Sequence, residues 1–345
     1  MKLFACDNCQ QTLYFENNRC VNCGETVAYQ PECVRLATVK PGDRQCRNAL
    51  ERDACNWLIT DTGAEFCRSC TLSAVIPDLS DPANELAWRR IEAAKRRLLY
   101  TLFALELPVQ NRAQDPGAGL AFRFLKGRED EPVMTGHDDG VITLNIDEAD
   151  FAFRENMREK MGEGYRTVLG HLRHEIGHYY WDRLLRDDTQ LLARFRDLFG
   201  DERASYEEAL ERHYQYGPSA NWEESFISAY ASMHPWEDWA ETWAHYLHMT
   251  DTLETARSHG LTVRAPVADR PGERISTERL ESGDFERLNS GWNALTLALN
   301  SLNRSMGMKD AYPFVRSPKV LDKLRFVHEL IQRQHKEESP HVQAA

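Results

Sequence analysis

The chain has 345 residues, of which 42% are hydrophobic and 10% aromatic, so it can bury a sizeable core and is not disordered. Its 42 basic and 54 acidic residues give a net charge of −12, which disfavours nucleic-acid and anionic-membrane partners. No apolar run is long enough to cross a bilayer, and the first residues do not resemble a signal peptide. We therefore expect a cytoplasmic protein that binds neither nucleic acid nor membrane.

All nine cysteines lie within the first 70 residues. In a chain without an export signal, Cys-x-x-Cys pairs favour metal binding over disulfides. Two such pairs open the chain, and two pairs supply the four thiolates of a tetrahedral structural zinc site. This first predicted site consists of Cys6, Cys9, Cys20 and Cys23. Iron held in a rubredoxin-like manner is the alternative.

A second group of four cysteines contains only one Cys-x-x-Cys pair. We predict a second structural zinc site from Cys46, Cys55, Cys67 and Cys70. Cys33 is left over and can replace Cys46 or Cys55 as a ligand, although such a residue is more often a buried thiol. The spacing predicts a zinc-ribbon module over residues 1–75, which can also contact a protein partner, and a second domain over residues 76–345.

The second domain is predicted to be mostly helical with a small β-sheet. Hydrophobic periodicity and N-cap residues indicate a helix over 84–105, and alternating apolar residues indicate short strands over 122–125 and 141–146. Further helices are expected near 151–161, 165–185, 189–199, 203–214, 221–232, 236–249, 284–305 and 318–334. A polar loop is expected over 250–283. The predicted class is therefore α+β.

The segment HEIGH begins at His174, inside a helix that is otherwise rich in apolar residues. Residues three and four apart share one face of a helix, so His174 and His178 can bind one ion. Glu175 lies beside them and can reach a water on that ion, which predicts a catalytic zinc with Glu175 as its base. Two incidental histidines on a solvated face are less compatible with such an apolar helix.

A catalytic zinc keeps three protein ligands and one water, so a third ligand is needed. The segment HPWEDWAETWAHYLHM, which starts at His234, has an apolar stripe of tryptophans and a separate face with Asp238, Glu241 and His245. We predict Glu241 as the third ligand. His245 and Asp238 are predicted to support the ligand shell, and both are also rival ligands.

At these residues the sequence resembles the gluzincin metallopeptidases, which pair HExxH on one helix with a glutamate on a later helix. It is more similar to a bacterial family of zinc-binding metallopeptidases that carry an N-terminal zinc ribbon. The matching blocks are CRNALERDACNWLITDTGAEFCRSC, TGHDDGVITLNIDEAD, LGHLRHEIGHYYWDRL and HPWEDWAETWAHYLHM. The resemblance implies a zincin-like fold, His174, His178 and Glu241 as ligands and Glu175 as base. Gluzincins commonly place an acidic residue where this chain has His245.

These observations predict a peptidase that uses one catalytic and two structural zinc ions to hydrolyse a peptide or protein substrate. Glu175 would take a proton from water and pass it to the leaving amine. Tyr246, Tyr312 and His137 are the candidates for a second donor to the oxyanion, and an edge strand over 141–146 would pair with substrate. The alternative is a zinc-ribbon binding or scaffold protein whose HEIGH site is structural or inactive.

Overall fold

The computed structural model describes residues 1–345 except 62, 129, 162–164, 264–283 and 339–345. Within these residues the chain forms two compact units. The first comprises residues 1–157 and 167–172, and the second comprises 158–166 and 173–345. Among the described residues, no helix combines the length and the apolar character that crossing a membrane requires.

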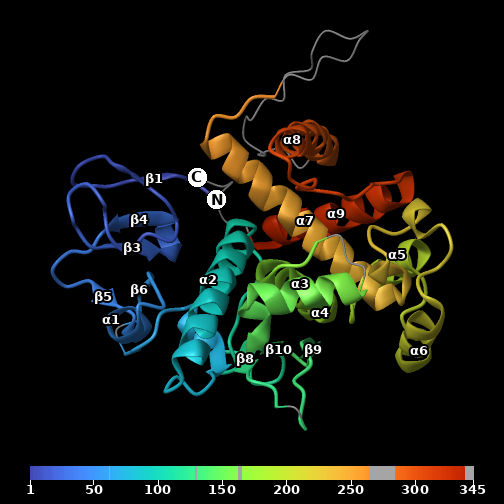
Figure 1. The fold of residues 1–345 in the computed structure, drawn as a ribbon, viewed down its shortest axis with the longest axis horizontal. Helices are drawn as coiled ribbons and strands as arrows, with labels where there is room; N and C mark the ends of the chain where they lie inside the picture. The colour runs from blue at the N-terminus through green and yellow to red at the C-terminus, as the bar shows by residue number, and fades with distance from the viewer. Residues whose placement is uncertain (62, 129, 162–164, 264–283, 339–345) are drawn as a thin grey trace. The chain divides into compact units, whose positions relative to one another are not determined.

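The N-terminal part of the first unit is made of very short strands. Three two-stranded antiparallel ladders are formed by β1 (Phe4–Ala5) with β2 (Thr12–Leu13), β3 (Val27–Gln30) with β4 (Arg35–Thr38), and β5 (Arg44–Gln45) with β6 (Leu58–Ile59). The short helices between them are η1 (Pro31–Cys33), α1 (Arg47–Arg52) and η2 (Cys70–Leu72). Figure 1 shows β3 and β4 side by side in this part. Ladders this short bury little surface, so they need additional stabilising interactions, such as those with a bound metal ion.

Aromatic rings fill the centre of this region. Phe15 packs edge-on against Tyr29 at a centroid distance of 5.0 Å, and Tyr29 lies 5.1 Å from Trp57. Tyr100 joins the cluster 5.2 Å from Phe15. Tyr100 belongs to α2 (Pro82–Ala104), so the cysteine-rich region shares its core with the helix that follows it. Edge-to-face packing of this kind stabilises a core beyond the area that it buries.

Helix α2 begins at Pro82, two residues before the predicted start at 84, because Asp81 accepts a hydrogen bond from the Ala83 amide and Pro82 occupies the first turn. One strand before α2 and three strands after it form a four-stranded sheet in the order β7 (Ser73–Val75), β8 (Ala121–Leu125), β10 (Val141–Asn145) and β9 (Gly136–Asp138). Strand β10 pairs with β8 on one side and with β9 on the other. The expectation that 141–146 forms an edge strand is therefore wrong, because β9 covers its free side.

The remaining elements of the first unit lead into the second. Helix η3 (Ile146–Ala149) follows β10 directly, and α3 (Phe151–Met161) comes next. Helix α4 (Val168–Leu184) carries the HEIGH segment and has its residues from Arg173 onward in the second unit.

The described elements of the second unit are all helices, joined by turns and loops. Its longer helices after α4 are α5 (Thr189–Phe199), α6 (Tyr206–Tyr216), α7 (Pro235–Ser258), α8 (Phe285–Ser305) and α9 (Pro318–Glu338). Figure 1 shows α7 passing beside both α8 and α9, with which it packs. Buried tryptophans of α7 form the centre of the core, with Trp239 and Trp243 both inaccessible to solvent.

Two predicted helices, 221–232 and 236–249, differ most from the structure. The helix expected over 221–232 is replaced by two short turns, η4 (Trp222–Glu224) and η5 (Tyr230–Ser232). Ser225, which follows η4, has a backbone φ of −135°, outside the helical region, so the helix does not continue from η4. Helix α7 continues to Ser258, past the predicted end at 249. The expected loop over 250–283 therefore starts later, and residues 264–283 lie outside the described residues.

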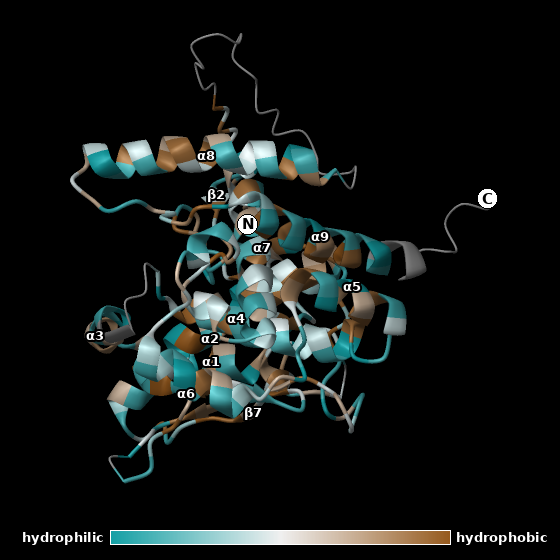
Figure 2. Ribbon diagram, turned by 90° about the vertical axis from the view of Figure 1, so that its right-hand side faces the viewer, coloured by the Kyte–Doolittle hydropathy of each residue, from teal (hydrophilic) through white to brown (hydrophobic). Residues whose placement is uncertain are grey.

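Helix α8 has some of its apolar side chains in the core and others exposed to solvent. Figure 2 shows brown and teal turns alternating along α8. Leu288 and Trp292 are buried, whereas Leu297 and Leu302 are more than half exposed. The amphipathic pattern that predicted this helix therefore describes its first half better than its second half.

Candidate active site and metal centres

The HEIGH helix and α7 approach each other closely at Gly177. A Cβ atom on Gly177 would lie 3.0 Å from the Cα of Ala240 and 3.2 Å from the Cβ of Trp243. The indole Nε1 of Trp239 donates a hydrogen bond of 2.8 Å to the Gly177 carbonyl. The glycine of HEIGH thus permits a backbone contact that brings polar residues of α4 and α7 to one place.

Three side chains converge at this crossing: His174 and His178 from α4 and Glu237 from α7. Their ligand atoms all lie within 4.8 Å of one another. The two Nε2 atoms are 3.3 Å apart, His174 Nε2 lies 2.9 Å from Glu237 Oε2, and His178 Nε2 lies 3.6 Å from Glu237 Oε1. Two imidazoles and one carboxylate form the ligand set of a catalytic zinc, which leaves a fourth position for water.

The chemistry of these atoms fits a bound cation. His174 Nδ1 lies 2.7 Å from Glu241 Oε1, so a neutral His174 that donates its proton there presents a lone pair at Nε2. That lone pair faces Glu237, which is 3% exposed, and acceptor atoms that converge without a donor are unfavourable unless a cation joins them. Burial lowers the pKa of His174, but the carboxylates of Glu237 and Glu241 outweigh it and hold that pKa well above its ordinary value. The field at this point therefore favours positive charge.

Glu241, predicted as the third ligand, lies on the other side of His174 from Glu237. One oxygen of Glu241 contacts His174 Nδ1, and the other accepts a hydrogen bond of 2.6 Å from the Ser228 hydroxyl. Burial would raise the pKa of Glu241, but the hydrogen bonds from His174 and Ser228 lower it to about 2. In the structure Glu241 therefore contacts Nδ1 of His174, and Glu237, not the predicted Glu241, belongs to the group of converging ligand atoms.

Several side chains around Glu237 were not identified from the sequence. The Tyr206 hydroxyl donates a hydrogen bond of 3.0 Å to Glu237 Oε1. The ring of Tyr230 lies 6.1 Å from that of His174, and the ring of Trp236 lies 4.5 Å from that of His178. Trp236 was assigned to the apolar stripe of α7, but it forms a wall of the ligand group instead.

Glu175 is 7% exposed and precedes the second ligand of α4 by one helical turn. Burial raises the pKa of Glu175, although the nearby histidines His174 and His178 oppose the shift. A carboxylate with a raised pKa is a better proton acceptor, which suits the role of general base.

The two residues predicted to support the ligand shell have other partners. Asp238 binds Lys323 of α9 at 2.5 Å, and Lys323 also donates to the Ser225 carbonyl at 2.7 Å. Burial raises the pKa of Asp238 to about 7. His245 Nδ1 lies 2.9 Å from the Tyr312 hydroxyl, and burial lowers the pKa of His245 to about 4. Asp238 therefore joins α7 to α9, and His245 joins α7 to the segment before α9.

The three candidates for a second oxyanion donor are engaged elsewhere. The Tyr246 hydroxyl lies 2.9 Å from His328 Nδ1, and the Tyr312 hydroxyl lies on His245. His137 belongs to β9 in the first unit, where its Nε2 accepts a hydrogen bond from the Gly140 amide at 3.0 Å. Tyr206 and Tyr230 are the hydroxyl-bearing residues that the structure places beside the ligand group.

The cysteines form two further groups, and the structure assembles both predicted sets. The ligand sulfurs of Cys6, Cys9, Cys20 and Cys23 lie within 4.8 Å of one another, as do those of Cys46, Cys55, Cys67 and Cys70. The Sγ atoms of Cys6 and Cys23 are 3.7 Å apart, and those of Cys55 and Cys67 are 3.6 Å apart. A tetrahedral zinc with Zn–S bonds of about 2.3 Å has sulfur–sulfur edges of about 3.8 Å, which these distances match. Cys33 is exposed and outside both groups.

Comparisons with known proteins agree with this description. Residues 84–330 match the model of the family described as "Putative zinc-binding metallo-peptidase", and residues 3–81 match a zinc-ribbon domain. The chain belongs to this metallopeptidase family, and its zinc-binding character, its α+β class and its N-terminal zinc ribbon are confirmed. The boundary at residue 75 stays a prediction.

The chain is also similar to curated proteins of mycobacteria. An uncharacterized protein of Mycobacterium tuberculosis and one of Mycobacterium bovis are each 44% identical to it over 333 residues, which cover 96% of this chain and 95% of each relative. No solved structure matches the chain.

Proposed function

We propose that this protein is a zinc-dependent peptidase whose catalytic metal is held by His174, His178 and Glu237. The observation that carries the proposal is the convergence of these three ligands beside the buried carboxylate of Glu175. Three protein ligands leave an open position, whereas a purely structural site is closed by four. Membership in a family of zinc-binding metallopeptidases supports the same activity.

The proton transfers of the reaction fall to Glu175. When bound, the zinc ion would lower the pKa of water and polarise the scissile carbonyl. Glu175, whose pKa burial raises, accepts a proton from the attacking water and then donates it to the leaving amine. Glu241 holds His174 in the tautomer that presents Nε2, and Ser228 holds Glu241.

We assign the second oxyanion donor to Tyr230. The Tyr206 hydroxyl is already bound to Glu237, where it orients this ligand. Tyr230 has its ring against His174, and burial, followed by the negative charge of Glu237 and a hydrogen bond with Tyr206, raises the pKa of its hydroxyl. A phenol that stays protonated can donate a hydrogen bond to the oxygen on which charge develops.

The two cysteine groups support one structural zinc ion each, which makes three zinc ions per chain. Four thiolates close the coordination shell, so these ions would stabilise the ribbon region and take no part in hydrolysis. Eight of the nine cysteines lie in these two metal-ligand groups, and cysteines used for metal in place of disulfides are typical of a reducing compartment such as the cytoplasm. The proposed substrate is a peptide or protein, without a nucleic-acid or membrane partner.

The test compares Glu175→Gln with wild type for zinc content and for hydrolysis of a fluorogenic peptide mixture. We expect zinc content near three for both proteins by elemental mass spectrometry. The substitution should reduce hydrolysis by about 10²- to 10⁴-fold, because general acid–base catalysis contributes on that scale. Glu211→Gln, which changes an exposed glutamate of α6, is the matched control and should retain full activity.

Two results would argue against the proposal. If wild type holds three zinc ions and hydrolyses no peptide in a broad mixture, a binding or scaffold role takes its place. If Glu175→Gln hydrolyses as fast as Glu211→Gln, the reaction does not use the site described here.

A further inference from the structure

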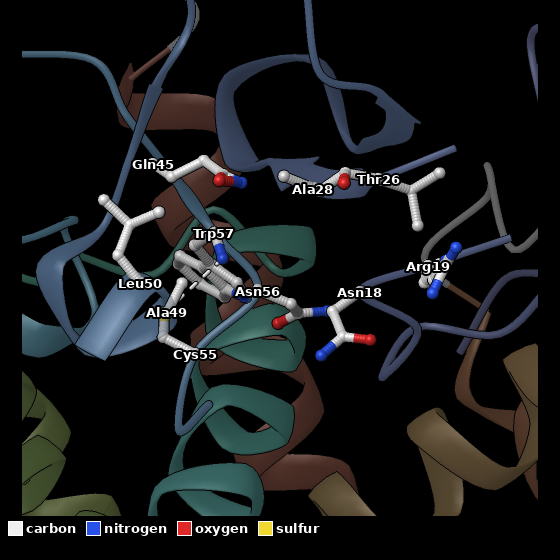
Figure 3. Close-up of a pocket in the computed structure, with 11 residues that line it drawn as sticks. Asn18, Arg19, Thr26, Ala28, Gln45, Ala49, Leu50, Cys55, Asn56 and Trp57 are labelled. Atoms are coloured by element: carbon white, nitrogen blue, oxygen red, sulfur yellow. Dashed lines mark hydrogen bonds between the residues drawn. The ribbon is translucent and has the colours of Figure 1, made fainter. Parts of the chain in front are cut away.

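A hollow of about 300 Å³ lies in the cysteine-rich part of the first unit. Its walls come from the segments that carry the two cysteine groups. Asn18, Arg19, Thr26, Val27 and Ala28 line it from the first half, and Gln45, Ala49, Leu50, Cys55, Asn56 and Trp57 line it from the second half. Figure 3 shows Gln45, Asn18 and Leu50 around the opening. This volume is at the lower end of ligand pockets, so it suits a short segment and not a folded domain.

One side of this hollow, which we call the ribbon pocket, is apolar. Leu50 of α1 is 69% exposed, and α1 buries none of its residues. Ala49 precedes Leu50, and Val27, Ala28 and Trp57 add further apolar lining. A leucine held at the rim of a pocket can bury its side chain against an apolar group of a ligand, which would remove both from water.

The polar side of the ribbon pocket has groups that lack partners. Asn56 is 5% exposed, and its Nδ2 donates to the Phe15 carbonyl at 2.6 Å. Its Oδ1 has no hydrogen-bond partner among the described residues. Among those residues, the side chains of Gln45 and Thr26 also make no hydrogen bond. A buried acceptor without a donor is costly, so this wall is suited to a ligand with N–H groups.

Charge further restricts the ligand. Arg19 is the charged residue of the pocket lining, where no aspartate or glutamate is present although the chain has a net charge of −12. Its Nε donates to the Gly24 carbonyl at 2.9 Å, and its guanidinium pairs with no carboxylate in the described part of the chain. A lone guanidinium beside uncharged donors favours a carboxylate on the ligand.

We propose that the ribbon pocket binds the C-terminal end of a peptide. The carboxylate would face Arg19, the last backbone N–H and C=O groups would pair with Asn56, Gln45 and Thr26, and an apolar last side chain would lie against Leu50. A peptide end supplies donors, acceptors, a negative charge and an apolar group within a small volume. The pocket would thereby select proteins by their C-terminus. This inference does not depend on the proposed peptidase activity.

The test measures fluorescence polarisation of a short fluorescein-labelled peptide that ends in leucine with a free carboxylate. The protein is the full chain carrying Glu175→Gln, so that a peptidase, if present, cannot consume the probe. We expect saturable binding below about 1 mM, and binding at least about tenfold weaker for the same peptide with an amidated C-terminus. An amidated peptide that ends in aspartate should bind as weakly, because its carboxylate is on a side chain.

Two matched variants locate the site. Leu50→Glu should weaken binding by at least about tenfold, because it puts a negative charge at the apolar rim. Leu86→Glu changes another exposed leucine on a helix, outside the pocket, and should bind like the parent protein. The proposal is overturned if no peptide binds saturably, if either amidated peptide binds as well as the free carboxylate, or if the two variants bind alike. None of these results bears on hydrolysis at Glu175.

Discussion

The cysteine groups and the HEIGH centre show two different ways of building a metal site. Each cysteine group takes four sulfurs from a stretch of at most 25 residues. The HEIGH centre takes two nitrogens from α4 and one carboxylate from α7, and it adds a buried acid that is not a ligand. A complete shell can only hold the chain together, whereas an incomplete shell beside an acid can activate water. Under the proposed function, the number of ligands thus distinguishes the two stabilising sites from the catalytic one.

The largest expected effect concerns stability, and it compares Cys67→Ser with His178→Ala. Each substitution removes one buried ligand and should reduce zinc content from about three ions to about two. Structural zinc contributes about 10 kcal/mol or more to folding in small zinc domains, so Cys67→Ser should unfold the region around its cysteine group. His178→Ala should leave the fold intact. Amide hydrogen exchange measures this, and unchanged protection of residues 46–70 in Cys67→Ser would contradict the comparison.

A second prediction sharpens the description of the HEIGH centre by comparing Glu237→Ala with Glu241→Ala. Glu237→Ala removes a ligand, so the centre should fail to retain zinc against a weak chelator. Glu241→Ala removes the partner of His174 Nδ1, which should weaken zinc binding by about 10- to 100-fold and leave a measurable site. Chelator competition gives both affinities. A larger loss in Glu241→Ala would restore Glu241 as the third ligand.

The smallest expected effect compares two histidine environments by their response to pH. Carboxylates raise the pKa of His174, whereas burial lowers the pKa of His245 to about 4. In the unfolded chain His245 would titrate near 6.5, so between pH 6.5 and 4 the unfolded state binds more protons and the folded state loses stability as pH falls. His245 should therefore contribute a loss of about 2 kcal/mol between pH 7.5 and 5.

Urea unfolding of wild type and His245→Gln at both pH values measures this contribution. Glutamine does not titrate, so the variant should lose about 2 kcal/mol less than wild type over the same interval. An equal loss in both proteins would show that His245 is protonated in the folded state, as a histidine beside a carboxylate would be.

Most helices of the described chain could be predicted because their apolar residues repeat with the helical period. The boundaries of α2 and α5 follow from N-cap aspartates, Asp81 and Asp188, which accept hydrogen bonds from the first turn. The segment 221–232 has suitable composition for a helix but forms two turns. One of its residues, Ser228, donates a hydrogen bond from its hydroxyl to Glu241. The local sequence pattern around Ser228 does not reveal this partner, which lies 13 residues away.

The candidate ligands His174 and His178 could be identified because they lie one turn apart on the same helix. Glu237 could not, because α7 offers three acidic residues within five positions and the pattern does not show which of them faces α4. The packing of α7 decides which acidic residue faces α4. Trp239 and Trp243 enter the core, and the indole of Trp239 donates a hydrogen bond to the Gly177 carbonyl. This rotation of α7 directs Glu237 toward the histidines and Asp238 toward Lys323.

The prediction that residues 141–146 form an edge strand was wrong because the sequence pattern does not show how strands are paired. Alternating apolar residues over 141–146 indicate a strand, but they do not indicate whether it has one or two neighbouring strands. Strand β9 has only three residues, Gly136–Asp138, and little apolar character, so the pattern did not mark it as a strand. Short strands that lie against a longer one are defined by backbone pairing, which side-chain periodicity does not report.

The contact at Gly177 has a consequence for the choice of metal. At Gly177 the backbones of α4 and α7 are in contact, because glycine has only a hydrogen atom in place of a side chain. This close approach of the two helices limits the separation between the histidines and Glu237. Zinc bonds to nitrogen and oxygen are about 2.0–2.2 Å long, whereas calcium requires about 2.3–2.6 Å and more ligands. A larger side chain at Gly177 would force the helices apart and widen the ligand set. The absence of a side chain at Gly177 therefore keeps the three candidate ligands close enough together for a small, tetrahedral ion.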